Sequence, residues 1–136
     1  MKRIAVLSPF AASEKRGRLE HALMAERLCL FVVRAGHAPF ASHAFYPLFL
    51  DEDLPSDRGL GLACEHRWLE ACEEVWVWDE WGISSGMKDA IEYVERINAN
   101  GNPSGHCAHC SHIQISILYF SKGEIPDQAW NGVTRG

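Results

Sequence analysis

The chain has 136 residues, of which 47% are hydrophobic and 23% charged, and this suits one globular domain with a core of its own. The formal net charge is −5 and no basic stripe is present, which argues against a nucleic-acid-binding protein. The longest apolar runs, such as residues 28–33, are far shorter than the roughly 20 residues of a membrane-spanning helix, so we expect no membrane association.

The N-terminal part of the chain predicts a strand followed by a long helix. Residues 2–8 are expected to form the strand, which Pro9 ends because proline does not continue a hydrogen-bond ladder. A helix is predicted from a cap at Ser13 to about Ala35, where Gly36 closes it. Its apolar residues at helical spacing are Leu19, Leu23, Leu30 and Val33.

A second strand and a second helix are predicted next. The strand covers residues 37–41, and Pro39 within it is typical of a sheet edge or a strand start. Residues 45–55 are rich in aromatic side chains and are expected to be irregular. A helix then runs from Ser56 to about Cys72. Its expected inward face consists of Leu60, Ala63, Cys64, Trp68 and Leu69.

The third strand is the clearest element of the sequence. Residues 75–78 are all β-branched or aromatic, as is typical of a buried strand. A helix follows over about residues 86–98, with Ser84 or Ser85 as its N-terminal cap. Its apolar stripe is Met87, Ala90, Ile91, Val94 and Ile97. A fourth strand is predicted over residues 113–120, after a loop rich in glycine and asparagine.

Strands that alternate with helices predict a three-layer α/β fold. We expect a flavodoxin-like parallel sheet of four to five strands with helices on both faces. Residues 1–122 form this domain, and residues 123–136 form a polar C-terminal tail. The loops after the first three strands then gather on one rim, where ligands bind in open α/β sheets.

Several short motifs follow one another along residues 1–97. They are Leu7-Ser-Pro-Phe, Gly36-His-Ala-Pro-Phe-Ala-Ser-His, Tyr46-Pro-Leu-Phe-Leu-Asp, Pro55 with Arg58-Gly-Leu-Gly, Cys72-Glu-Glu-Val-Trp-Val-Trp, and Ser85-Gly-Met-Lys with Ile91-Glu-Tyr. In their order and spacing they resemble the nucleoside 2-deoxyribosyltransferase-like superfamily, in particular its small, often phage-encoded branch. The chain after Asn98 does not follow the pattern.

The resemblance implies a chemistry and a setting. Members of this superfamily exchange or hydrolyse the N-glycosidic bond of a nucleoside or nucleotide, through a carboxylate that attacks C1′ and a second acid that handles protons on the base. It implies no required cofactor and a small-molecule ligand. It further implies a homo-oligomer that completes its sites across a subunit boundary, in the cytoplasm of a bacterium or of a phage-infected host.

The catalytic glutamate of the superfamily normally lies four residues after the glycine that opens the helix. Here that glycine is Gly86, and the fourth residue is Ala90. Asp89 lies about 100° round the helix and closer to the rim, so it is the better replacement, whereas Glu92 points away. The alternative for Asp89 is a solvated acid that favours the helix dipole. Asp79, which ends the third strand, is the second acidic candidate or a turn residue.

Candidate ligand-binding residues lie in the loops of the same rim. They are Ser8, Pro9, Phe10, Arg18, His43, Trp81, Ser85, Gly86 and Met87. Trp81 could stack on a nucleobase, His43 could contact phosphate or act as an acid, and Arg18 could meet an anion. The alternatives are core packing for Trp81, a structural role for His43 and a solvated face for Arg18. The residues after the first strand could equally form an ordinary strand exit.

The cysteines raise a possible zinc site. Cys107 and Cys110 have the C-x-x-C spacing of half a site, and His106 and His112 flank them. A second pair at such spacing is absent from the sequence, so further ligands would be local or come from a symmetry mate. The other three cysteines lie in apolar helical surroundings, which is typical of free thiols in a reducing cytosol.

Two main function classes remain open at this level. The first is an enzyme that acts on the N-glycosidic bond, with Asp89 or another acid in place of the missing glutamate. The second is a binding module that has lost turnover and holds a nucleotide-like ligand as a sensor or sequestering agent. A zinc-stabilised interaction protein is a third, weaker class.

Overall fold

The structure of the protein is a computed structural model that describes residues 1–11, 17–103 and 114–121. In chain order its elements are β1 (Arg3–Leu7), α1 (Arg18–Arg34), β2 (Ala38–Phe40), α2 (Ser42–Phe45), the 3-10 turn η1 (Tyr46–Leu48), α3 (Pro55–Leu69), β3 (Glu74–Trp78), α4 (Ser85–Asn100) and β4 (Ser116–Phe120).

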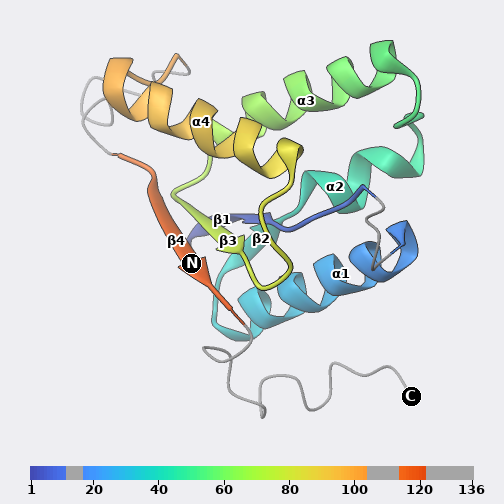
Figure 1. The fold of residues 1–136 in the computed structure, drawn as a ribbon. Coiled ribbons are helices and arrows are strands. Elements are labelled where there is room, and N and C mark those ends of the chain that lie inside the picture. Colours follow the sequence, from blue (N-terminus) through green and yellow to red (C-terminus); the bar gives the residue numbers. More distant parts are fainter. Residues whose placement is uncertain (12–16, 104–113, 122–136) are drawn as a thin grey trace.

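The four strands form one parallel sheet in the order β2-β1-β3-β4. Helix α1 covers one face, and α3 and α4 lie over the other (Figure 1). This confirms the predicted three-layer α/β fold with flavodoxin-like strand order. In this order β1 has β2 on one side and β3 on the other. The chain that leaves β1 and the chain that leaves β2 therefore run to opposite sides of β1. In such sheets a crevice opens at the carboxyl ends of the strands beside this point.

Alternate residues of each strand point to opposite faces of the sheet and build two cores. On the face covered by α4, Ala5 and Leu7 of β1 pack with Val75 and Val77 of β3. On the face covered by α1, the buried residues are Ile4, Val6, Leu28, Val32, Ala41 and Trp78. The strands are therefore apolar on both sides, as expected for a parallel sheet with helices on both faces.

Helix α4 follows its predicted pattern. Ser84 is the N-cap, and its Oγ accepts a hydrogen bond from the backbone N–H of Met87 at 3.3 Å. All five residues of the predicted apolar stripe are buried. Ala90 among them is 0% exposed and packs in the core, so the position at which the resemblance implies a catalytic glutamate faces the sheet.

Helix α1 buries a different face from the one predicted. Leu19, Leu23 and Val33 are exposed, and Leu30 is only half-buried. The residues that are buried instead are His21, Ala25, Leu28 and Val32. The second half of the helix is apolar nearly all round, so periodicity did not define its inward side. Gly36 has a φ of +91°, which supports the predicted helix end, while Ser13 lies outside the described residues.

Helix α3 also differs from the prediction. Leu69 is its only buried residue, whereas Leu60 and Trp68 are 58% and 53% exposed and Ala63 is exposed. The preceding stretch is not wholly irregular, because it contains α2 and η1. The helix lies over β1 and β2 without filling the space between them, and a cavity separates it from the sheet.

The two edges of the sheet are β2 and β4. Pro39 lies within β2, and its place at the edge agrees with the prediction. At the start of β4, the side chain of Asn98 holds Ile115 through two hydrogen bonds of 2.9 Å, one to its N–H and one to its carbonyl. Within the described part of the chain, none of the helices is long and apolar enough to cross a membrane.

Candidate functional site

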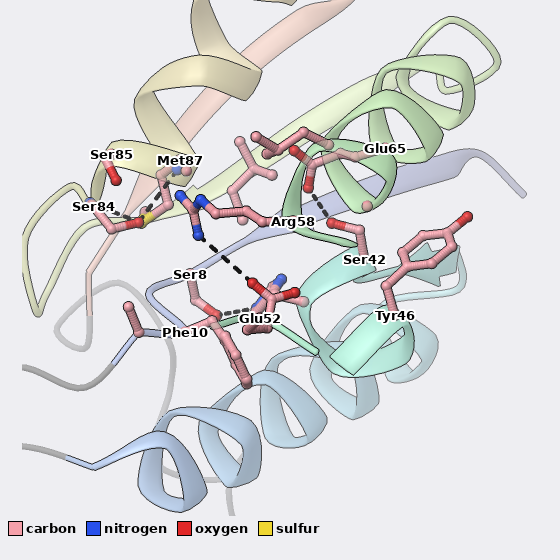
Figure 2. A pocket seen from close by; sticks show the side chains of 16 residues that line it. Ser8, Phe10, Ser42, Tyr46, Glu52, Arg58, Glu65, Ser84, Ser85 and Met87 are labelled. Carbon is pink, nitrogen blue, oxygen red and sulfur yellow. Dashed lines mark hydrogen bonds and ion pairs between the residues drawn. The ribbon is translucent and has the colours of Figure 1, made fainter. Parts of the chain in front are cut away.

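A cavity of about 90 Å³ opens at the carboxyl end of β1, between α2, α3 and the start of α4 (Figure 2). Segments far apart in the sequence form its walls. The residues that line it are Leu7, Ser8, Phe10, Ala11, Ser42, His43, Tyr46, Glu52, Arg58, Gly61, Leu62, Glu65, Ser84, Ser85, Gly86 and Met87. This is the rim at which the strand order predicts a ligand.

Ser8 and His43 join two walls of the cavity. Ser8 directly follows β1 and is buried, and its Oγ lies 2.6 Å from Nε2 of His43 in α2. Burial, followed by the nearby His21, lowers the pKa of His43 to about 4. His43 is therefore uncharged at neutral pH, and the pair holds the exit of β1 against α2 without a formal charge.

The pKa of His43 predicts a pH-dependent stability. Between about pH 6.5 and about pH 4 the unfolded chain binds a proton at His43 that the folded chain does not bind, so stability falls as the pH falls through this window. The loss of unfolding free energy from pH 7 to pH 4 should be smaller in His43→Gln than in the wild type, by on the order of 2 kcal/mol. Urea denaturation at both pH values measures this, with His37→Gln as the matched control. An equal loss in the wild type and in His43→Gln would contradict the prediction.

Glu65 is a carboxyl group of α3 that points into the cavity and accepts a hydrogen bond from Oγ of Ser42 (Figure 2). Burial raises the pKa of Glu65 above the ordinary value, and the charges of Asp89 and Glu52 raise it further. The Ser42 hydroxyl and His66 oppose this shift without reversing it. Glu65 therefore keeps its proton to a higher pH than an exposed glutamate.

An ion pair forms another part of the wall. Nη1 of Arg58 lies 3.6 Å from Oε2 of Glu52, and the two side chains are 41% and 17% exposed. The first turn of α4 lines the cavity beside them, and the N–H groups at a helix start favour an anion. The cavity thus combines a carboxyl group of raised pKa, a carboxylate, a guanidinium and a helix N-terminus.

The structure brings six of the predicted ligand-binding residues together at this cavity. They are Ser8, Phe10, His43, Ser85, Gly86 and Met87. Their shared position follows from the strand order, because the loops after β1 and β2 and the start of α4 end on the same rim.

Five predicted site residues do not line the cavity. Asp89 instead lies 2.7 Å from Nε2 of His66, which joins α4 to α3, and the backbone carbonyl of Asp79 accepts from Gly82 N–H in a turn. Arg18 forms an ion pair of 2.6 Å with Asp53, and the Trp81 ring lies 5.6 Å from that of His21. The fifth is Pro9, between two residues that do line the cavity.

Sequence reasoning missed the residues that α2, η1, α3 and the preceding loop contribute. These are Ser42, Tyr46, Glu52, Arg58 and Glu65. A signal was present in α3, where Arg58, Gly61, Leu62 and Glu65 recur at i, i+3, i+4 and i+7 and therefore share one helix face. The prediction instead places the apolar residues on other sides of the helix at its inward face.

The residues of the predicted zinc site lie in a part of the chain that the structure does not describe. They are His106, Cys107, Cys110 and His112. Within the part of the chain that the structure describes, no group of three or more histidine, cysteine, aspartate or glutamate side chains is arranged to hold a metal. The homo-oligomer, the cytoplasmic location and the polar tail also stay predictions.

The chain was compared with protein families, with curated proteins and with solved structures. A family model described as "Domain of unknown function (DUF7768)" matches residues 2–102. No curated protein sequence matches the chain. The solved structure of a CMP N-glycosidase, BcmB, from Clostridium botulinum is similar to the chain with a TM-score of 0.46 and 14% identity, over 96% of each chain.

Proposed function

The chain belongs to the family described as Domain of unknown function DUF7768, and we propose that it binds a nucleoside or nucleotide at the β1 rim and cleaves or exchanges its N-glycosidic bond. The observation that carries this proposal is Glu65, a carboxyl group of raised pKa that faces a cavity at the carboxyl ends of parallel strands. The motifs that resemble the nucleoside 2-deoxyribosyltransferase-like superfamily support it independently.

The proposed roles follow from the environment of each group. Glu65 acts as the general acid and gives its proton to the departing base as the bond between C1′ and the base nitrogen breaks. Glu52 takes the proton of the incoming water, whose oxygen forms the new bond to C1′. In the exchange reaction, a second nucleobase replaces water as the acceptor, and its nitrogen forms the new bond to C1′. Two carboxyl groups in different environments are a recurring solution for acid and base work at one site.

Arg58 and the start of α4 are assigned to binding. The guanidinium holds Glu52 in place at 3.6 Å and adds positive charge to the cavity. Together with the helix N-terminus it favours a ligand with a negatively charged or strongly polar sugar side. Ser8 and His43 shape the opposite wall through their hydrogen bond.

A binding module without turnover is the second candidate. The observation in its favour is Ala90, which takes the position of the superfamily's glutamate and is 0% exposed. In that case the cavity holds a nucleotide-like ligand, and Glu65 serves as a hydrogen-bond partner only.

One assay separates these candidates. The purified full chain is incubated with nucleosides and nucleoside 5′-monophosphates of the common bases, and free base is measured by chromatography. The enzyme proposal expects base release from at least one compound, with heat-denatured protein as the control. Thermal stabilisation by a compound that releases no base supports the binding module. Neither release nor stabilisation would contradict both.

A further inference from the structure

A second and larger cavity of about 310 Å³ lies between α3 and the sheet. Its sheet side is formed by β1 and the edge strand β2, where Ala5 and Ala38 have short side chains. The register pairs Arg3 with Ala38 and Ala5 with Phe40, so these residues share one face of the sheet. Ala5 is buried in the core, whereas Ala38 is only half-buried, and the cavity lies between these short side chains and α3.

The walls of this second cavity are mostly apolar. Phe40 and Trp68 lie with ring centroids 5.2 Å apart, and both line it. The indole N–H of Trp68 already donates to the Tyr46 hydroxyl at 2.9 Å. Burial raises the pKa of Cys72 to about 12, so this thiol in the wall is uncharged at neutral pH. The cavity therefore suits an apolar or aromatic group that is held by contact.

The two cavities meet at Glu65. Leu7, Ser42 and Glu65 line both of them. The hydrogen bond from Ser42 to Glu65 marks this boundary. A molecule that extends from one cavity into the other has to pass the Glu65 carboxyl group.

The volumes of the two cavities indicate which part of a substrate each cavity can hold. Pockets for small ligands typically measure about 300–1,000 Å³. The first cavity, at about 90 Å³, falls below this range, while the second, at about 310 Å³, falls within it. The polar cavity alone is therefore smaller than a typical ligand pocket, and the two halves of a nucleoside match the two cavities in polarity.

From this juxtaposition we propose that the heterocycle of the substrate occupies the apolar cavity beneath α3, while the sugar lies in the polar cavity and the glycosidic bond lies beside Glu65. The inference rests on the proposed function, and it adds how the protein distinguishes one nucleobase from another. Selection is by the size and apolar surface of the ring system that packs against the adjoining Phe40 and Trp68 rings, rather than by a set of hydrogen bonds.

Filling the apolar cavity tests this placement. Ala38→Phe adds a ring at the edge strand, and Ala63→Phe makes the same change at an exposed position of α3 that lines neither cavity. Binding of AMP, CMP, GMP, UMP and the corresponding nucleosides is measured by isothermal titration calorimetry. For the compound that the wild type binds most tightly, Ala38→Phe is expected to weaken binding by about tenfold or more, and Ala63→Phe by less than about twofold.

Other results would overturn the placement of the heterocycle in the apolar cavity. Unchanged binding in Ala38→Phe, or equal weakening in both variants, would overturn the placement while leaving the proposed function intact. Absence of binding of all four nucleotides and of the corresponding nucleosides to the wild type would overturn both. A change in sedimentation coefficient in Ala38→Phe with unchanged nucleotide binding would assign the cavity to a second copy of the chain. If Ala38→Phe does not fold, Trp68→Ala replaces it as the test. Trp68 is a half-exposed side chain in the wall of the same cavity, and its removal is expected to weaken binding of the same compound by the same factor.

Discussion

Glu65→Gln is expected to reduce base release by about 10²–10⁴-fold, the usual contribution of a general acid. Glutamine keeps the size of the side chain and can still bond to Ser42, but it has no acidic proton for the departing base. The fold should survive, because Glu65 lines a cavity rather than the core. The measurement is kcat/KM for the compound found in the base-release assay, together with circular dichroism of the variant.

The pH profile gives the same prediction a second readout. In the wild type, kcat/KM should fall as the pH rises through the raised pKa of Glu65, because the acid form is then lost. Glu65→Gln should lack this limb. A purely structural role for Glu65 would lower activity at every pH and leave the shape of the profile unchanged.

Asp89→Asn is the informative comparison for Glu65→Gln. Asp89 is the acid that sequence motifs favour, but its carboxylate lies 2.7 Å from His66 and is not part of the cavity wall. We expect this variant to retain most of its activity. If Asp89→Asn abolished base release and Glu65→Gln did not, the assignment of the acid would be wrong.

Ala90→Glu is expected to destabilise the protein by about 3 kcal/mol or more rather than to create a catalytic site. Ala90 is 0% exposed in the core between α4 and the sheet, so a glutamate there must bury a carboxyl group without a partner. The added atoms also overpack a close-packed layer. Urea denaturation gives the change in the free energy of unfolding.

Ala99→Glu provides the matched control for this substitution. Ala99 lies on the same helix and is exposed, so the change should cost less than about 1 kcal/mol. A stable Ala90→Glu protein with increased base release would show that position 90 reaches the ligand, contrary to its burial in the structure.

The motifs around α4 show how far local sequence carries. Ser84 caps the helix and the apolar stripe from Met87 to Ile97 is buried as predicted, because capping and helical periodicity depend on residues within a few positions. Ser85, Gly86 and Met87, which the same motif predicts to bind a ligand, line the cavity.

Helix α3 shows where local sequence does not suffice. Its apolar residues Leu60 and Trp68 predict an inward face, yet both are largely exposed. The polar side with Arg58 and Glu65 turns to the cavity instead. The apolar residues of α3 do not form one continuous stripe, so the side that turns to the sheet is set by where the chain enters and leaves the sheet.

The sequence by itself determined the alternation of strands and helices, the parallel sheet and the rim where its loops meet, because these follow from periodicity, caps and strand-helix order. Only the tertiary structure decided that Glu65 faces the cavity at this rim and that Asp89 lies against His66 instead. The physical reason is that burial and a shifted pKa arise from neighbours distant in the chain, which meet only when α2, α3 and β1 come together.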